Sequence, residues 1–154
     1  RDLCAAHGAL FIVNDRVDLA LAVEADGVHL GQGDLPPAQA RRLLGPDRLI
    51  GRSTHAPAQL QQAMADGCDY AGVGPLQATP TKPGREPVGL DYLRQAAQIA
   101  TIPHYAIGGV DVQLLPALLE AGGPHCRVAV VRAVMEAADP AAAARQLLEL
   151  LADG

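Results

Sequence analysis

Aromatic residues are scarce in this sequence: they make up 3% of its 154 residues, and tryptophan is absent. A core must therefore be built from small and aliphatic side chains, which is feasible because 49% of the residues are hydrophobic. No apolar run approaches the roughly 20 residues that a membrane-spanning helix needs. The first residues, "RDLCAAHG", contain neither an initiator methionine nor the apolar stretch of a signal peptide. We therefore expect a soluble chain without a membrane partner, which starts inside a longer protein.

Cysteine is rare, and positive charge is not clustered. Cys4, Cys68 and Cys126 are odd in number, widely spaced and without a Cys-x-x-Cys pair, which argues against a disulfide framework and against a zinc site. This cysteine usage fits the reducing cytoplasm. A net charge of -5 without a run of Lys or Arg argues against nucleic acid as a partner, but a small phosphorylated ligand remains possible at a local site.

Glycine and proline are abundant, with 16 and 12 residues, and they divide the chain into short segments. A chain of this length suits one domain, residues 1–154. Six short apolar runs recur about every 20 residues, and each predicts a strand. The predicted strands are residues 9–14, 27–30, 49–53, 70–73, 104–107 and 127–131.

A helical segment follows each of these runs, and its ends are marked by Gly, Pro or Asp. The predicted helices are residues 17–25, 37–44, 58–66, 90–100, 112–121 and 141–152. Strands with little polar alternation, each followed by a helix, predict a parallel sheet covered by helices. Such a sheet is either doubly wound or closed into a (β/α)₈ TIM barrel.

Polar residues and glycines follow the carboxyl ends of all the predicted strands. They are Asn14 and Asp15, residues 32–34, Ser53, residues 74–87, Gly108 and Gly109, and Arg132. In a barrel these positions form the mouth where the chemistry takes place, whereas a doubly wound sheet concentrates them at one switch point. The first unit also lacks a Gly-x-Gly-x-x-Gly turn. We therefore favour an α/β TIM barrel; because six units do not close eight strands, we expect a partial barrel of about strands 3 to 8.

Four segments resemble the successive motifs of the thiamine-phosphate synthase family, in the same order and at the expected separations. They are "FIVNDRVDLALAVEADGVHLGQGDLP", "GRSTHAPAQLQQA", "GVGPLQATPTKPGREPVGL" and "AIGGV", and the resemblance covers nearly the whole chain. It implies a transferase that joins hydroxymethylpyrimidine pyrophosphate to hydroxyethylthiazole phosphate, or its carboxylated form, and releases pyrophosphate with Mg²⁺ as cofactor. Family members also carry a Gln-x-Arg…Lys pyrophosphate clamp on their second strand. None precedes Arg1, so we expect the fragment alone to be inactive.

Two aspartates are candidate metal ligands. The family reaction needs stabilisation of a departing diphosphate and alignment of two rings, and it needs no protein nucleophile. Mg²⁺ is held by one or two carboxylates together with phosphate oxygens and water. Asp15 and Asp34 follow adjacent predicted strands and suit this role. The alternative is that each caps the helix after it; the family resemblance favours the metal.

Further polar side chains are candidates for substrate contacts or for local structure. Asn14 offers a donor and an acceptor to the aminopyrimidine or the diphosphate, or else it completes a turn. Ser53 is able to donate its hydroxyl to the diphosphate, or else it caps the turn before residue 58. The resemblance favours the ligand for both. We expect His55 to be a surface turn histidine and His29 to be a hydrogen-bonded core histidine.

Residues 74–87 form a loop that is longer than the usual 2 to 6 residues and is able to cover a bound ligand. Thr79 and Thr81, with Pro80 between them, offer hydroxyl and backbone donors, and Lys82 adds a mobile charge. The resemblance implies that this stretch contacts both substrates; the alternative is a solvated loop stiffened by prolines. The related thiazole tautomerases carry a catalytic histidine where this chain has Pro75. A tautomerase-like isomerase is therefore less favoured, and a non-catalytic ligand-binding barrel is the other alternative.

The last two predicted strands end in residues suited to a phosphate. Gly109 has no side chain to block the approach of a phosphate to the backbone N–H groups. Backbone donors at Val131 and Arg132 are candidates for the thiazole phosphate. Compared with the family pattern, Arg132 stands where a serine is usual, and its guanidinium is either a second phosphate contact or a solvent-exposed group. Gly33 replaces a frequent glutamate, which reduces the negative charge beside Asp34.

Overall fold

Six parallel strands form one sheet in the computed structural model, which describes residues 1–80, 84, 86–123 and 126–152. The strands lie in the order in which they occur along the chain. They are β1 (Ile12–Asn14), β2 (Gly27–Leu30), β3 (Leu49–Thr54), β4 (Tyr70–Val73), β5 (His104–Ile107) and β6 (Cys126–Ala129). The predicted parallel sheet with strands near these six positions is confirmed.

Helices separate the strands and continue after the last one. They are α1 (Asp2–Ala6), α2 (Val17–Ala22), α3 (Pro37–Leu44), α4 (Pro57–Ala65), α5 (Gly89–Ile99), α6 (Leu115–Gly122), α7 (Arg132–Met135) and α8 (Pro140–Ala152). Local signals fix several of their ends. Proline occupies the first turn of α3 and of α4, and Gly45 ends α3 with a positive φ of 79°. Asp139 precedes α8, where its Oδ1 accepts the N–H of Ala142 at 2.9 Å.

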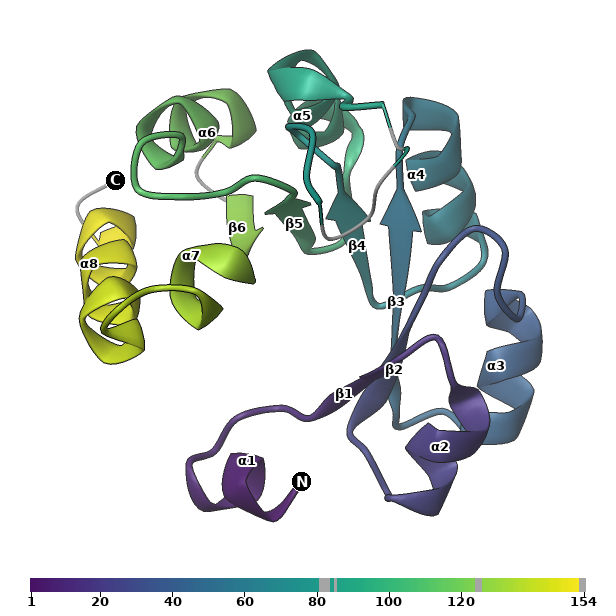
Figure 1. The fold of residues 1–154 in the computed structure, drawn as a ribbon. Coiled ribbons are helices and arrows are strands. Elements are labelled where there is room, and N and C mark those ends of the chain that lie inside the picture. The colour runs from purple at the N-terminus through teal and green to yellow at the C-terminus, as the bar shows by residue number, and fades with distance from the viewer. Residues whose placement is uncertain (81–83, 85, 124–125, 153–154) are drawn as a thin grey trace.

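The order of the strands decides between the two architectures that the sequence left open. A doubly wound sheet reverses its order at a switch point, whereas the strands of a (β/α)₈ barrel follow one another around the axis. The observed order from β1 to β6 is sequential, so the doubly wound alternative is wrong. Figure 1 shows the sheet as an arc, with α2 to α6 placed along its outer side.

The main core lies between the sheet and these outer helices. Side chains alternate between the two faces of a strand, and in β2 the fully buried Val28 and Leu30 face the helices while His29 faces the opposite way. Leu60 of α4 and Leu93 of α5 are fully buried in this layer. The opposite, inner face of the sheet is less completely covered, and the side chains of His29 and its neighbours on that face are only half-buried.

Helices α1 and α7 were not predicted from the sequence, and α6 begins later than expected. The predicted last strand reached Val131, but β6 ends at Ala129 and the chain turns directly into α7. Helix α6 begins at Leu115 rather than at residue 112, because Asp111 Oδ1 accepts the N–H groups of Gln113 and Leu114 and holds them in a turn. None of the helices in the described part of the chain has the length and hydrophobicity required to cross a bilayer.

Candidate functional site

The inner face of the sheet borders a cavity of about 480 Å³. All six strands, β1 to β6, contribute residues to its lining. Its polar groups come from Asn14, His29, Tyr70 and Tyr105, and aliphatic residues such as Ile107 complete the wall. Such a mainly apolar hollow with a few convergent polar groups is typical of a small-molecule site. Asn14, one of the predicted substrate-binding residues, thus lines this cavity.

His29 connects two of the polar side chains near this cavity. Its Nδ1 lies 3.1 Å from the Tyr70 hydroxyl, and its Nε2 lies 2.9 Å from Ser53 Oγ. Burial raises the pKa of the Tyr70 phenol to about 12, so this hydroxyl keeps its proton at neutral pH. The expected hydrogen bonds of His29 are therefore present, and the half-buried ring lies on the inner face of the sheet, where it lines the cavity.

Ser53 does not occupy the helix cap position that its alternative role required. The N-cap residue of α4 is Ala56, whereas Ser53 lies in β3 and its Oγ bonds to His29. The Ser53 carbonyl also accepts the side-chain N–H of Gln32 at 2.6 Å. These contacts fix the Ser53 hydroxyl beside the cavity-lining histidine, although Ser53 itself lines neither cavity.

Asp15 and Asp34 follow β1 and β2, which are neighbouring strands. The Asp15 N–H donates to the His29 carbonyl at 2.8 Å, and Asp15 adopts a positive φ of 63°. Aspartate tolerates this conformation better than most residues, and such conformations cluster at functional sites. Asp34 Oδ2 accepts the N–H of Gly31 at 2.7 Å. The N-cap residues of α2 and α3 are Arg16 and Pro36, so neither aspartate takes the cap position of the alternative interpretation.

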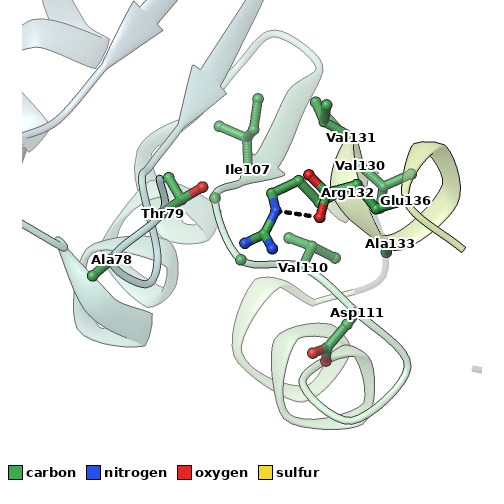
Figure 2. Close-up of a pocket in the computed structure, with 13 residues that line it drawn as sticks. Ala78, Thr79, Ile107, Val110, Asp111, Val130, Val131, Arg132, Ala133 and Glu136 are labelled. Atoms are coloured by element: carbon green, nitrogen blue, oxygen red, sulfur yellow. Dashed lines mark hydrogen bonds and ion pairs between the residues drawn. The ribbon is translucent and has the colours of Figure 1, made fainter. Parts of the chain in front are cut away.

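A second cavity of about 280 Å³ lies where the loop after β5 meets the start of α7 (Figure 2). Gly108 and Gly109 line it with positive φ angles of 97° and 72°. A Cβ atom on Gly109 would lie 2.8 Å from Gln77 Cβ, so the two loops approach too closely for a side chain there. The Gln77 N–H donates to the Gly108 carbonyl at 3.1 Å, which holds the loop after β4 against the loop after β5.

Four residues predicted to contact the substrates line this second cavity. Thr79, Gly109, Val131 and Arg132 all line it. Figure 2 shows the Arg132 side chain reaching across the cavity, with its Nε donating to Glu136 Oε2 at 2.8 Å. In the first turn of α7 the Val134 N–H donates to the Val131 carbonyl at 3.2 Å, and the N–H groups of Arg132 and Ala133 come before this bond, where a helix offers no internal acceptor.

The two cavities adjoin, because Ile107 and Ala129 line both of them. Together they consist of a larger, mainly apolar compartment and a smaller compartment whose lining includes Gly108, Gly109 and the start of α7.

The remaining predicted residues lie in the loop after β4 and at position 55. Pro80 is exposed, and Thr81 and Lys82 lie outside the described residues. His55 was predicted to be a surface histidine, which is wrong: it is half-buried, and its Nδ1 donates to the Gly74 carbonyl.

Neither Cys68 nor Cys126 lines either cavity. Burial raises the pKa of each thiol to about 11, so both remain protonated at neutral pH. A protonated thiol is a weak nucleophile and a poor metal ligand.

Three contributors to the site were not identified from the sequence: Gln32 as a loop anchor, Tyr70 and Glu136. A signal existed for Glu136, since a residue four positions after Arg132 shares its helix face. No group of three or more His, Cys, Asp or Glu in the described ranges is arranged to hold a metal ion, so a metal would need to be held by fewer protein ligands.

Comparisons with known proteins give a consistent family. The family model described as thiamine monophosphate synthase (TMP-TENI) matches residues 1–134. The chain is 60% identical over 154 residues to thiamine-phosphate synthase of Gloeobacter violaceus, covering 100% of this chain and 45% of that protein. It is 59% identical over 149 residues to the thiamine-phosphate synthase of Prochlorococcus marinus strain MIT 9313, covering 97% of this chain and 42% of that protein. The chain thus spans less than half the length of these curated relatives.

A solved structure agrees with this assignment. Thiamine phosphate pyrophosphorylase from Pyrococcus furiosus superposes with a TM-score of 0.88 at 36% identity, over 99% of this chain and 72% of that one. The match of the family model, which covers most of the chain, and the match of the fold agree with the order of the sequence motifs. The chain belongs to the thiamine monophosphate synthase family.

Proposed function

We propose that the protein is a thiamine-phosphate synthase, a transferase of thiamine biosynthesis. It joins hydroxymethylpyrimidine pyrophosphate to hydroxyethylthiazole phosphate, or its carboxylated form, and releases pyrophosphate. The observation that carries this proposal is the pair of adjoining cavities on the inner side of the sheet, the smaller of which lies at the carboxyl ends of β5 and β6. The larger one has an apolar wall and the Asn14 amide for an aminopyrimidine, and the smaller one is bordered by the backbone of Gly108, Gly109, Val131 and Arg132, which offers N–H donors to a phosphate.

The residues of the chain bind and align the two substrates in this proposal. The Asn14 amide and the Ser53 hydroxyl hold the pyrimidine pyrophosphate, and the donors of Gly109, Val131 and Arg132 hold the thiazole phosphate. The C–O bond to the diphosphate breaks and the thiazole nitrogen forms a C–N bond to the same carbon. Positioning and electrostatic stabilisation are sufficient for such a reaction, so no covalent enzyme intermediate is needed.

We propose that Asp15 and Asp34 hold Mg²⁺ together with the diphosphate. The donor set fits this ion, because two carboxylates at the ends of adjacent strands leave coordination positions for phosphate oxygens and water. The Asp34 carboxylate accepts one N–H bond at Oδ2, and a carboxylate has about four lone-pair sites in total. When bound, the ion supplies positive charge to the departing diphosphate.

We also propose that the six strands correspond to strands three to eight of an eight-stranded barrel. The sequential order of the strands and the half-buried inner face of the sheet support this correspondence. The family's Gln-x-Arg…Lys clamp belongs to the second strand of such a barrel. We therefore expect a chain of residues 1–154 alone to form no product, and product formation by that chain would refute this part of the proposal.

The function is tested by measuring product formation from the two heterocycles with the whole protein over a range of Mg²⁺ concentrations. Asp34→Asn keeps an acceptor for the Gly31 N–H but removes the charge. We therefore expect this variant to need about tenfold more Mg²⁺ for half-maximal activity, which corresponds to a loss of about 1.4 kcal/mol in the free energy of Mg²⁺ binding. Asp47→Asn is the matched control, because Asp47 is exposed in the turn before β3. Normal turnover of Asp34→Asn at limiting Mg²⁺ would contradict the metal assignment.

The same assay distinguishes the alternative functions. A thiazole tautomerase-like isomerase would convert the thiazole substrate without the pyrimidine substrate, and it is disfavoured because the buried Pro75 has no acid or base group. A non-catalytic ligand-binding barrel would bind the substrates and release no pyrophosphate. Either result would overturn the proposed condensation.

A further inference from the structure

Three inner-face side chains form a hydrogen-bonded chain: the Tyr70 hydroxyl, the His29 ring and the Ser53 hydroxyl. They come from three different strands, β4, β2 and β3. The Tyr70 oxygen and His29 Nδ1 are 3.1 Å apart, and His29 Nε2 and Ser53 Oγ are 2.9 Å apart. The proposed function uses only Ser53, so the purpose of the other two residues is open.

The register of the sheet explains how Tyr70 reaches His29 across an intervening strand. Gly51 of β3 pairs with His29 on one side and with Tyr70 on the other. A Cβ atom at Gly51 would collide with the Tyr70 ring, so the absence of a side chain opens the path between the two residues. Tyr105 packs its ring against Tyr70 in an edge-to-face arrangement at 5.5 Å, which fixes the tyrosine from the other side.

A neutral imidazole has one N–H donor and one acceptor nitrogen, so this chain has two possible directions. In the first, the Tyr70 hydroxyl donates to Nδ1, the Nε2–H donates to Ser53 Oγ, and the serine proton is directed away from the histidine. In the second, Ser53 donates to Nε2, the Nδ1–H donates to the Tyr70 oxygen, and the serine presents only lone pairs to a ligand. Hydrogen bonds in such a chain polarise one another, so its members change direction together.

An anionic ligand selects the first direction. A phosphate oxygen needs a donor, and lone pairs on the serine oxygen would repel it. Tyr70 is suited to begin the chain, since burial raises its pKa to about 12 and the phenol keeps the proton that it donates. Without the tyrosine hydroxyl, His29 Nδ1 loses the donor that favours the Nε2–H tautomer.

We propose that Tyr70 and His29 are positioning residues that direct the Ser53 hydroxyl proton toward the diphosphate of the pyrimidine substrate. The inference rests on the proposed function, in which Ser53 contacts that diphosphate, and it extends the site by two residues. Neither residue touches the reacting atoms in this role. Their effect passes through the orientation of a single donor.

A double-mutant cycle in the whole protein measures the coupling between Tyr70 and Ser53. We expect Tyr70→Phe to lower kcat/KM for the pyrimidine pyrophosphate by about 3- to 10-fold, the effect of one hydrogen bond, and to leave the KM for the thiazole phosphate unchanged. In a Ser53→Ala background the same substitution should have no further effect, because the donor that it directs is already gone. Additive effects of the two substitutions would overturn the proposal.

Tyr92→Phe is the matched control. The Tyr92 hydroxyl donates to Thr54 Oγ1 at 2.6 Å in the buried layer under α5, so this variant also loses one tyrosine hydrogen bond. We expect it to lower the thermal unfolding temperature without changing either substrate constant. If it reproduces the kinetic effect of Tyr70→Phe, that effect is a general loss of stability and the proposal fails.

The tautomer of His29 gives a readout that does not depend on turnover. ¹⁵N NMR of histidine-labelled protein with Mg²⁺ and inorganic pyrophosphate should show His29 protonated at Nε2, with its signals assigned by their loss in His29→Gln. An Nδ1–H tautomer in this complex would overturn the proposal. Failure of the proposed function has a different result, since the unmodified protein would then form no product from the two heterocycles.

Discussion

The Gln32 side chain donates a hydrogen bond to the Ser53 carbonyl at 2.6 Å and so ties the loop after β2 to the end of β3. The Gln32 carbonyl in turn accepts a longer bond, 3.4 Å, from Arg52 Nη2. The same loop carries Asp34, one of the two proposed metal ligands. The position of this carboxylate relative to the Ser53 hydroxyl therefore depends on a residue that contacts neither metal nor substrate.

We predict that Gln32→Ala raises both the Mg²⁺ concentration for half-maximal activity and the KM for the pyrimidine pyrophosphate. One lost hydrogen bond of about 0.5 to 1.5 kcal/mol corresponds to an increase of up to about tenfold. Steady-state kinetics at several Mg²⁺ concentrations measures both quantities. Gln39→Ala, an exposed position on α3, is the control and should change neither. An unchanged Mg²⁺ dependence in Gln32→Ala would show that the loop keeps its position without this anchor.

Gly109→Ala tests the second compartment. We predict a higher KM for the thiazole phosphate, because the new Cβ would lie 2.8 Å from Gln77 Cβ and would push the loop after β4 away from the cavity. Alanine also costs roughly 1 kcal/mol at a φ of 72°. Substrate titrations and urea unfolding separate the two effects.

Gly8→Ala is the control for the backbone conformation. Gly8 has a similar φ of 64°, but its Cβ would meet no atom within 4 Å. This variant should lose a similar amount of stability, roughly 1 kcal/mol, and keep both KM values. If Gly109→Ala behaves like Gly8→Ala in every measurement, the close contact with Gln77 has no part in binding.

Alkaline pH should weaken the fold through Cys68. Its pKa is raised from 9.0 to about 11 by burial, so the unfolded chain loses the thiol proton at a lower pH than the folded chain. The protonated Cys68 thiol makes its full contribution to the free energy of unfolding below about pH 9, and this contribution disappears as pH rises toward 11. In that range the free energy of unfolding falls by at most about 1.4 kcal/mol per pH unit. Urea unfolding of the protein and of Cys68→Ala across this range should give free energies that converge as pH rises. A constant difference would contradict the raised pKa.

The elements of the fold were largely predictable because local signals mark them. Residues 27–30 and 37–44 were predicted with the bounds that β2 and α3 have in the structure. Apolar runs and the Pro or Gly residues at helix ends are sufficient for such segments. Helix α7 could not be found in this way, since four residues are too few for hydrophobic periodicity to be visible.

The contacts inside the site depend on register, which a single sequence does not specify. Residues at the carboxyl ends of strands were correctly expected to gather at one edge of the sheet. The contact between His29 and Tyr70 spans 41 positions and requires Gly51 to stand between them in the same row. No local pattern indicates that alignment. The partners of Ser53 were missed for the same reason.

Arg132 and Glu136 provide the final prediction, in which two substitutions shift the same constant in opposite directions. Arg132→Ser should raise the KM for the thiazole phosphate by about tenfold or less, because it removes a half-exposed guanidinium while the backbone donors remain. Glu136→Gln keeps an acceptor for Arg132 Nε and removes a negative charge from the wall of the same cavity. A phosphate there would experience less repulsion, so we expect this variant to lower the KM modestly. General destabilisation would move both variants in the same direction, and that result would exclude a phosphate from the cavity shown in Figure 2.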